Sequence, residues 1–144
     1  MRRLSTRALT ATLALLIPAL NAGCGSTTTP TTSGSSTTTP VTIIETYSGT
    51  VAVNGATTFS FGVAAAGQVT ATYKTISPTT TATMGIALGV WNGSTCNVVI
   101  ANDNAILNST VIGTASAAGT LCVRAYDIGK LTTTQNIELS ITHF

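Results

Sequence analysis

The sequence predicts an all-β fold for residues 41–144, an antiparallel sandwich of about eight strands of the jelly-roll or immunoglobulin-like kind. Apolar and polar residues alternate with a period of two in short runs that end at turn residues. Threonine and valine, whose β-branched side chains pack well on a pleated sheet, are frequent in these runs. No segment after the N-terminal apolar run has helical periodicity of useful length.

The alternation places the strands in order along the chain. We expect strands near 43–53, 57–65, 68–76, 83–91, 96–101, 109–115, 120–127 and 135–143. The inward-facing side chains expected from this parity are Phe59, Phe61, Val63, Val69, Ala71, Tyr73, Met84, Ile86, Leu88, Val90, Leu121, Val123, Ala125, Ile137, Leu139 and Ile141. Asn54-Gly55 and Asn92-Gly93 each separate two apolar runs. Because Asn-Gly accepts the positive φ angles of a type I′ turn, both pairs predict hairpins.

The first 23 residues have the features of a secretory signal peptide. Arg2, Arg3 and Arg7 precede an apolar run from Ala8 to Leu20 that ends in small residues. A membrane-spanning helix needs about 20 apolar residues, so this run is too short to be one. We therefore expect residues 1–23 to be a signal peptide that is cleaved, and the protein to be exported.

Cys24 follows this run in the sequence Asn21-Ala22-Gly23-Cys24, which resembles the bacterial lipobox. A lipobox cysteine is acylated and becomes the new N-terminus of the mature protein. The alternative is ordinary cleavage after Ala22, which would leave a free thiol. Residues 24–40 contain Thr, Ser, Gly and Pro without charge, so we expect a disordered linker. This linker serves as a membrane tether if Cys24 is lipidated, and otherwise has no assigned function.

The cysteine count supports lipidation. The chain has three cysteines, an odd number for an exported protein. Cys96 begins one expected strand and Cys122 lies within another, so we expect these two to form a disulfide and Cys24 to be the remaining one. Cys122 has the opposite parity to Leu121 and Val123, which predicts a bridge outside the core. Two free thiols are the alternative, which an oxidising compartment disfavours.

Charge argues against a nucleic-acid partner. Lys and Arg total 6 and Asp and Glu total 4, giving +2. The three arginines of the signal peptide leave with it, so the mature side chains carry 3 basic and 4 acidic groups, or −1. Binding to phosphates requires clustered Lys and Arg, which the mature chain lacks.

Catalytic motifs are not apparent in the sequence. The single histidine, His143, shares the inward parity of Ile137, Leu139 and Ile141 and is expected at the end of the sandwich. One histidine and a disulfide cannot supply the four ligands of a zinc site. No acid/base motif surrounds the carboxylates, which are Glu45, Asp103, Asp127 and Glu138. We therefore expect neither an enzyme nor a metal site, and no cofactor.

Two further groups of residues are candidates for binding. Asn102-Asp103-Asn104 offers oxygen ligands for calcium, but calcium usually takes six to eight, so a loop held by Asx turns is preferred. Trp91 has the opposite parity to Met84 and Leu88 and therefore faces outward. Together with Tyr126 it could stack on a sugar ring. The alternative is an aromatic that covers the rim of the sandwich.

The segment from Thr46 to Ser77, with "AAGTLCVRAYDIG" and the last strand, resembles the bacterial pre-peptidase C-terminal domain. The matching positions are Gly49, Phe59, Phe61, Val63, Gly67, Gly119, Thr120, Val123 and Asp127, and the resemblance spans residues 45–144. It implies a jelly-roll-like sandwich without catalysis, usually an accessory to a secreted peptidase. Some relatives bind calcium or matrix polymers.

The function expected from these observations is a non-catalytic binding or structural module of a bacterial envelope lipoprotein, tethered at the surface. The alternative is a carbohydrate-binding module that uses Trp91 and Tyr126. The expected partners are the membrane, through the lipid, and an envelope protein or polysaccharide. Gly25 follows Cys24 where inner-membrane retention is associated with Asp, which favours the outer membrane or cell surface.

Overall fold

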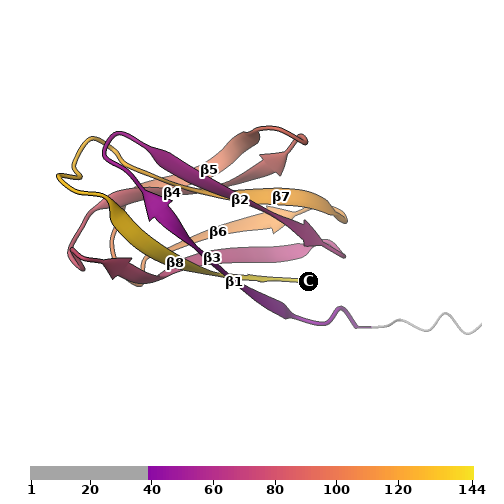
Figure 1. Ribbon diagram of the computed structural model, residues 1–144. Helices are drawn as coiled ribbons and strands as arrows, with labels where there is room; N and C mark the ends of the chain where they lie inside the picture. The colour runs from indigo at the N-terminus through magenta and orange to yellow at the C-terminus, as the bar shows by residue number, and fades with distance from the viewer. Residues whose placement is uncertain (1–38) are drawn as a thin grey trace, which may run out of the picture. The chain divides into compact units, whose positions relative to one another are not determined.

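The computed structural model describes residues 39–144, which form eight strands (Figure 1). The strands are β1 (Ile43–Val51), β2 (Ala56–Val63), β3 (Gly67–Ser77), β4 (Met84–Trp91), β5 (Cys96–Ala105), β6 (Thr110–Ala115), β7 (Gly119–Tyr126) and β8 (Gln135–His143). In this part of the chain no helix is long and apolar enough to cross a membrane. The expected all-β class and the expected eight strands are confirmed.

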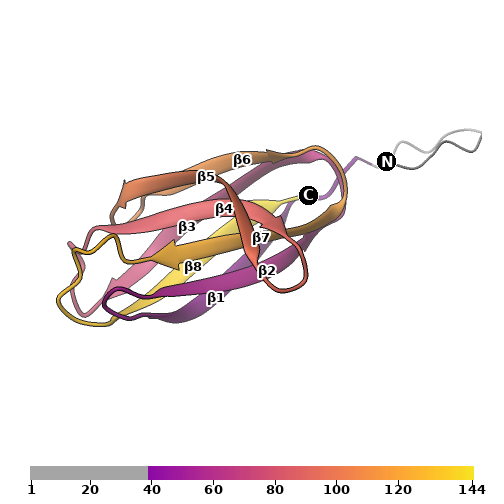
Figure 2. The same cartoon turned by 90° about the horizontal axis from the view of Figure 1, so that it is seen from above.

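The strands form two four-stranded antiparallel sheets, ordered β1-β8-β3-β6 and β2-β7-β4-β5. Each sheet alternates strands from the two halves of the chain, so the pairs nest as β1 with β8, β2 with β7, β3 with β6 and β4 with β5. This nesting is that of a jelly roll, the first of the two expected sandwich types. The two layers lie face to face with their loops gathered at the ends (Figures 1 and 2).

The core lies between the sheets and is built by the alternation that the sequence shows. Most of the side chains expected to face inward on β3, β4, β7 and β8 are buried. Leu121 is only partly buried, and Val90 is an exception, being 48% exposed. Val90 borders a narrow apolar opening between the sheets, about 70 Å³ in volume, beside Leu88, Val99 and Thr114. The inward parity of Val90 is therefore not enough to bury it.

Tyr73 links the two layers through the core. It is fully buried on β3, and its hydroxyl donates a 2.9 Å hydrogen bond to the carbonyl oxygen of Gly85 on β4. Burial, followed by the electrostatic effect of Tyr126, raises the pKa of Tyr73, so this hydroxyl remains a donor. A buried polar group is satisfied in this way without admitting water.

The two Asn-Gly pairs have different roles. Asn92-Gly93 connects neighbouring antiparallel strands, β4 and β5, so this hairpin prediction is confirmed. Asn54-Gly55 connects β1 to β2, which belong to opposite sheets, so this hairpin prediction is wrong. Only Asn54 of one pair (φ 56°) and Gly93 of the other (φ 101°) have positive φ, so neither turn is type I′.

The remaining difference concerns residues 102–104, for which the sequence favours a loop. They continue β5 to Ala105, where the pairing with β4 is irregular between Met84 and Ile86. One Asx contact is present, because Asn104 N–H donates to Asn102 Oδ1 at 3.0 Å. The Asx hydrogen bond that was expected in a loop therefore forms within a bulged part of the strand.

Candidate binding site

The candidate site lies on the outer surface of the sheet β2-β7-β4-β5, which we call the hairpin face. Outward positions on β4 are Gly85, Ala87, Gly89 and Trp91, and on β7 they are Cys122, Arg124 and Tyr126. The register pairs Gly85 with Tyr126, Ala87 with Arg124 and Gly89 with Cys122. Residues paired across antiparallel strands point to the same side, so Trp91 and Tyr126 share this face.

The hairpin between β4 and β5 folds back over the hairpin face, and Figure 2 shows the start of β5 crossing the sheet. The crossing passes over Gly89. A Cβ atom on Gly89 would overlap with the carbonyl oxygen of Asn97, so any side chain there would block this path. The register shifts at the same point, from Leu88 paired with Ile100 to Gly89 paired with Val98. The bulge at Val99 redirects β5 across the sheet.

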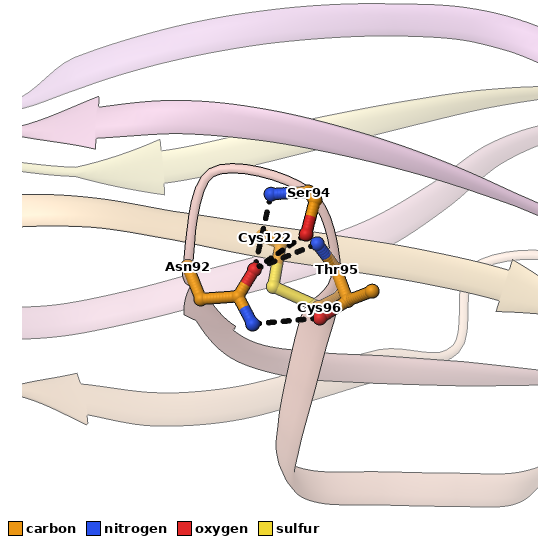
Figure 3. The surroundings of a disulfide bond; sticks show 5 residues. All are labelled: Asn92, Ser94, Thr95, Cys96 and Cys122. Carbon is orange, nitrogen blue, oxygen red and sulfur yellow. Dashed lines mark hydrogen bonds between the residues drawn. A yellow bond between two sulfur atoms is a disulfide. The ribbon is translucent and has the colours of Figure 1, made fainter.

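A disulfide between Cys96 and Cys122 holds the crossing segment to β7 (Figure 3). The Cα atoms are 5.8 Å apart. Cys122 is fully buried, but it lies on the hairpin face beneath the crossing segment and not among the core residues. The expected bridge and its position outside the core are both confirmed.

The turn of this hairpin is organised by Asn92. Its Oδ1 accepts hydrogen bonds from the backbone N–H groups of Ser94 and Thr95, at 3.0 and 2.8 Å, and its Nδ2 donates to Thr95 Oγ1 at 2.8 Å (Figure 3). The disulfide begins at the next residue, Cys96. Side-chain hydrogen bonds and a covalent link therefore fix the same short segment.

The fixed segment forms one wall of an open groove of about 350 Å³. The groove is lined by Ala56, Thr58, Trp91, Ser94, Thr95, Cys96 and Arg124. Trp91 supplies the aromatic surface, and three hydroxyl groups and one guanidinium group supply the polar part. Such a mixture of apolar surface with a few polar groups is typical of ligand sites.

Tyr126 lies outside the groove and contacts other residues. Its ring rests on Gly85, where a Cβ atom would overlap with it, and its hydroxyl donates to Asp103 Oδ1 on β5. Burial, followed by the hydrogen bond and charge of Asp103, raises the pKa of Tyr126 to about 12, although Arg124 opposes this shift. The guanidinium carbon of Arg124 lies 5.5 Å from the ring centroid.

Trp91 and Tyr126, the two aromatic residues that the sequence suggested for binding, therefore lie on the same face but make different contacts. Trp91 lines the groove, whereas Tyr126 supports Arg124, which lines the same groove. The sequence analysis did not single out Arg124 or Thr58. Arg124 alternates along the strand with Cys122 and Tyr126, so its outward orientation could have been predicted from the sequence.

A second polar cluster lies between the two sheets, near their edge strands β1 and β2. His143 is 1% exposed, its Nε2 has no hydrogen-bond partner, and this atom lies 3.8 Å from Glu45 Oε2. Tyr47 donates to the same carboxylate, and its ring packs 5.3 Å from that of Phe59. Burial, followed by the hydrogen bond and charge of Glu45, raises the pKa of Tyr47 to about 12. His143 has the inward orientation that its parity predicted.

Two of the other acidic residues, Asp103 and Asp127, accept hydrogen bonds from the protein itself. Asp103, the candidate calcium ligand, accepts the Tyr126 hydroxyl. Asp127 accepts backbone N–H groups from Asn54 at 2.8 Å, Lys130 at 2.9 Å and Leu131 at 3.1 Å. Residues 39–144 contain no group of three or more His, Cys, Asp or Glu placed to hold a metal ion.

The opposite outer surface, on the sheet β1-β8-β3-β6, also has a shallow hollow, about 440 Å³ in volume. It is lined by Ser48, Gly49, Thr50, Thr75, Asn136, Ile137 and Glu138. This hollow has no aromatic side chain, and its only charged residue is acidic. We therefore regard the groove on the hairpin face as the better candidate site.

No family model matches this chain, and no curated protein matches it. Cys24, the expected signal peptide 1–23 and the linker up to residue 38 lie outside the residues that the structure describes.

Proposed function

We propose that the protein is a non-catalytic binding module, tethered by lipidated Cys24 to the outer membrane or cell surface of a bacterium. The observation that carries this proposal is the groove beside Trp91, whose wall is a hairpin held by a disulfide. A wall fixed in advance loses little conformational freedom when a ligand binds, which favours affinity. The resemblance to accessory domains of secreted peptidases agrees with a role in binding.

Polysaccharide is the ligand class that fits this groove best. Trp91 offers a flat apolar surface on which the apolar side of a sugar ring can stack. Thr58, Ser94 and Thr95 place hydroxyl groups beside it, which can exchange hydrogen bonds with sugar hydroxyls. Tyr126 contributes indirectly, because it orients Arg124.

The test of binding uses the mature chain from Cys24 with that cysteine replaced by Ser, titrated with soluble polysaccharides of the bacterial and plant cell wall. Trp91→Ala should abolish binding, whereas Trp91→Phe, which retains a ring, should preserve part of it. Ile112→Ala, at an exposed position on β6 in the other sheet and outside the groove, is the control. Equal binding by the Trp91→Ala variant would show that the groove is not the site.

The test of tethering is the intact mass of protein extracted from membranes. Lipidation should give a chain that begins at Cys24 and exceeds its calculated mass by the acyl groups. An N-terminus at Gly23 with unmodified Cys24 would exclude the lipid anchor, while leaving the binding proposal to be judged by the titration.

A further inference from the structure

We propose that the groove selects an acidic polysaccharide, one whose sugars carry carboxylate groups, and that Arg124 pairs with the carboxylate. This inference rests on the proposed carbohydrate-binding function and names the chemistry of the ligand.

The first observation is the charge of the groove. Arg124 is the only charged residue among those that line it, and the other polar groups are neutral hydroxyls. Within residues 39–144 no carboxylate oxygen lies within 4 Å of the Arg124 guanidinium. The single contact of this kind between a basic and an acidic side chain in that part of the chain joins His143 and Glu45. Arg124 is exposed, so its positive charge is available to a ligand. Its planar fork of N–H donors matches the two oxygens of a carboxylate.

The second observation is that Arg124 is positioned without being neutralised. The centroid of the Tyr126 ring lies 5.5 Å from the guanidinium carbon of Arg124. The ring is itself held by Gly85 beneath it and by Asp103 at its hydroxyl. An aromatic face attracts a cation but leaves its N–H groups free to donate. The guanidinium can therefore meet a ligand at a defined place.

The nearby carboxylates are already engaged. Asp103 accepts the hydroxyl of Tyr126, and Asp127 accepts backbone N–H groups of the connecting loops. Asp127 also lies one residue beyond Tyr126, past the point where β7 ends. These bonds hold both carboxylates in contacts of their own, so neither competes with a ligand for a direct pair with Arg124.

The third observation is the spatial relation of Arg124 and Trp91, which line the same groove. A sugar stacked on the indole can present a substituent to the guanidinium. A neutral sugar would gain the stacking and the hydroxyl contacts, whereas a uronate would gain these and a charge-assisted hydrogen bond. The hollow on the opposite face carries Glu138 and would repel the same ligand.

The experiment compares polymers that differ in charge alone. Calorimetric titration of the mature chain would use polygalacturonate and its fully methyl-esterified form, and hyaluronan and its methyl ester. We expect at least one acid form to bind more tightly than its ester, and this difference to shrink as salt is raised. Arg124→Gln should weaken binding of the acid form about tenfold or more and leave binding of the ester unchanged.

Lys74→Gln is the matched control, because it removes the same charge from an exposed position on β3, in the other sheet. It should leave both affinities unchanged. Equal binding of acid and ester forms, lost with Trp91→Ala, would overturn the acidic preference and retain the carbohydrate function. An acid preference that survives Arg124→Gln would overturn the role of Arg124. If neither acid nor ester binds, both the acidic preference and the proposed use of the groove for carbohydrate fail.

Discussion

The two outer surfaces of this sandwich are both formed by four antiparallel strands, but they are covered in different ways. The surface of β1-β8-β3-β6 presents hydroxyl groups at most outward positions, and we call it the threonine face; its members include Thr46, Ser48, Thr50, Thr70, Thr72, Thr110, Thr114, Ser140 and Thr142. The hairpin face has glycine or alanine at three successive outward positions of β4, namely Gly85, Ala87 and Gly89. One face is covered by its own side chains, and the other is covered by chain that folds over it.

The difference shows how missing side chains can create a site. Without a Cβ atom at Gly89, the start of β5 can cross the sheet, and without one at Gly85, the Tyr126 ring can lie flat. Both features bring groups to the groove, since the crossing segment forms its wall and Tyr126 supports Arg124. On the threonine face every strand keeps its side chains, and that surface remains shallow.

Removing the disulfide should have the largest effect on the hairpin face. The bridge closes a loop with a sequence separation of 26 residues, and the chain-entropy model gives about 3.5 kcal/mol for a loop of this length. Cys96→Ser with Cys122→Ser should lower the free energy of unfolding, measured in urea, by about 2–4 kcal/mol. An unchanged urea midpoint would show that the crossing does not depend on the bridge.

Filling the space above β4 should have the next largest effect. Gly89→Ala places a methyl group against the Asn97 carbonyl, which is backbone and cannot turn aside, so we expect a loss of about 1–3 kcal/mol. Gly62→Ala on β2 is the control, because a Cβ atom there meets no other atom within 4 Å. Thermal unfolding of both variants measures the contrast. If the two variants unfold alike, the close crossing over Gly89 is not a constraint.

Acid should loosen the connections that join one sheet to the other. Partial desolvation raises the pKa of Asp127, but the backbone N–H groups of Asn54, Leu131, Lys130 and Gly129 lower it more, so the pKa lies below its ordinary value of 3.8. A depressed pKa stabilises the fold above the ordinary value and loses that contribution as pH falls through the folded value. Asp127→Asn should therefore destabilise the protein at pH 7, and the deficit should vanish in acid. A deficit that is the same in thermal melts at pH 7 and at about pH 2.5 would contradict the ionic role.

Single hydroxyl deletions should have the smallest effects and still distinguish the faces. Tyr126→Phe removes the bond to Asp103 and should cost about 0.5–1.5 kcal/mol. Thr72→Val removes an exposed 2.9 Å bond to Thr110 on the threonine face and should change stability by no more than about 0.5 kcal/mol. Urea titrations of the two variants compare them. A larger loss from Thr72→Val would mean that the threonine face, too, depends on specific contacts.

The alternation of side chains predicted the strands and the core because it reports directly which face of a strand is buried. It also placed Trp91, Tyr126 and Cys122 on the outer side. The pairing of strands is not local information, which is why Asn54-Gly55 signalled a chain reversal but not that β1 and β2 join different sheets. The lipid on Cys24 remains a prediction from the sequence.

The groove could not be predicted from parity alone. The groove exists because the start of β5 leaves the plane of its sheet. The alternation of side chains predicts orientation only for strands that remain in the plane of a sheet. The series Gly85, Ala87, Gly89 was a usable signal, because small residues at alternating positions indicate an outer face that another element covers. The role of Arg124 follows only when that cover is known, since the hairpin turns an ordinary exposed cation into the single charge of a groove.

The nested pairing of the strands also bears on the order in which the protein can fold. Synthesis releases the N-terminus first, yet β1 pairs only with β8, at the other end of the domain. The β4–β5 hairpin has the shortest loop to close, and each pair outside it spans a longer one, which costs more entropy. The first strand made is therefore among the last to find its partner, and it must wait, unpaired, until residues 135–143 have emerged.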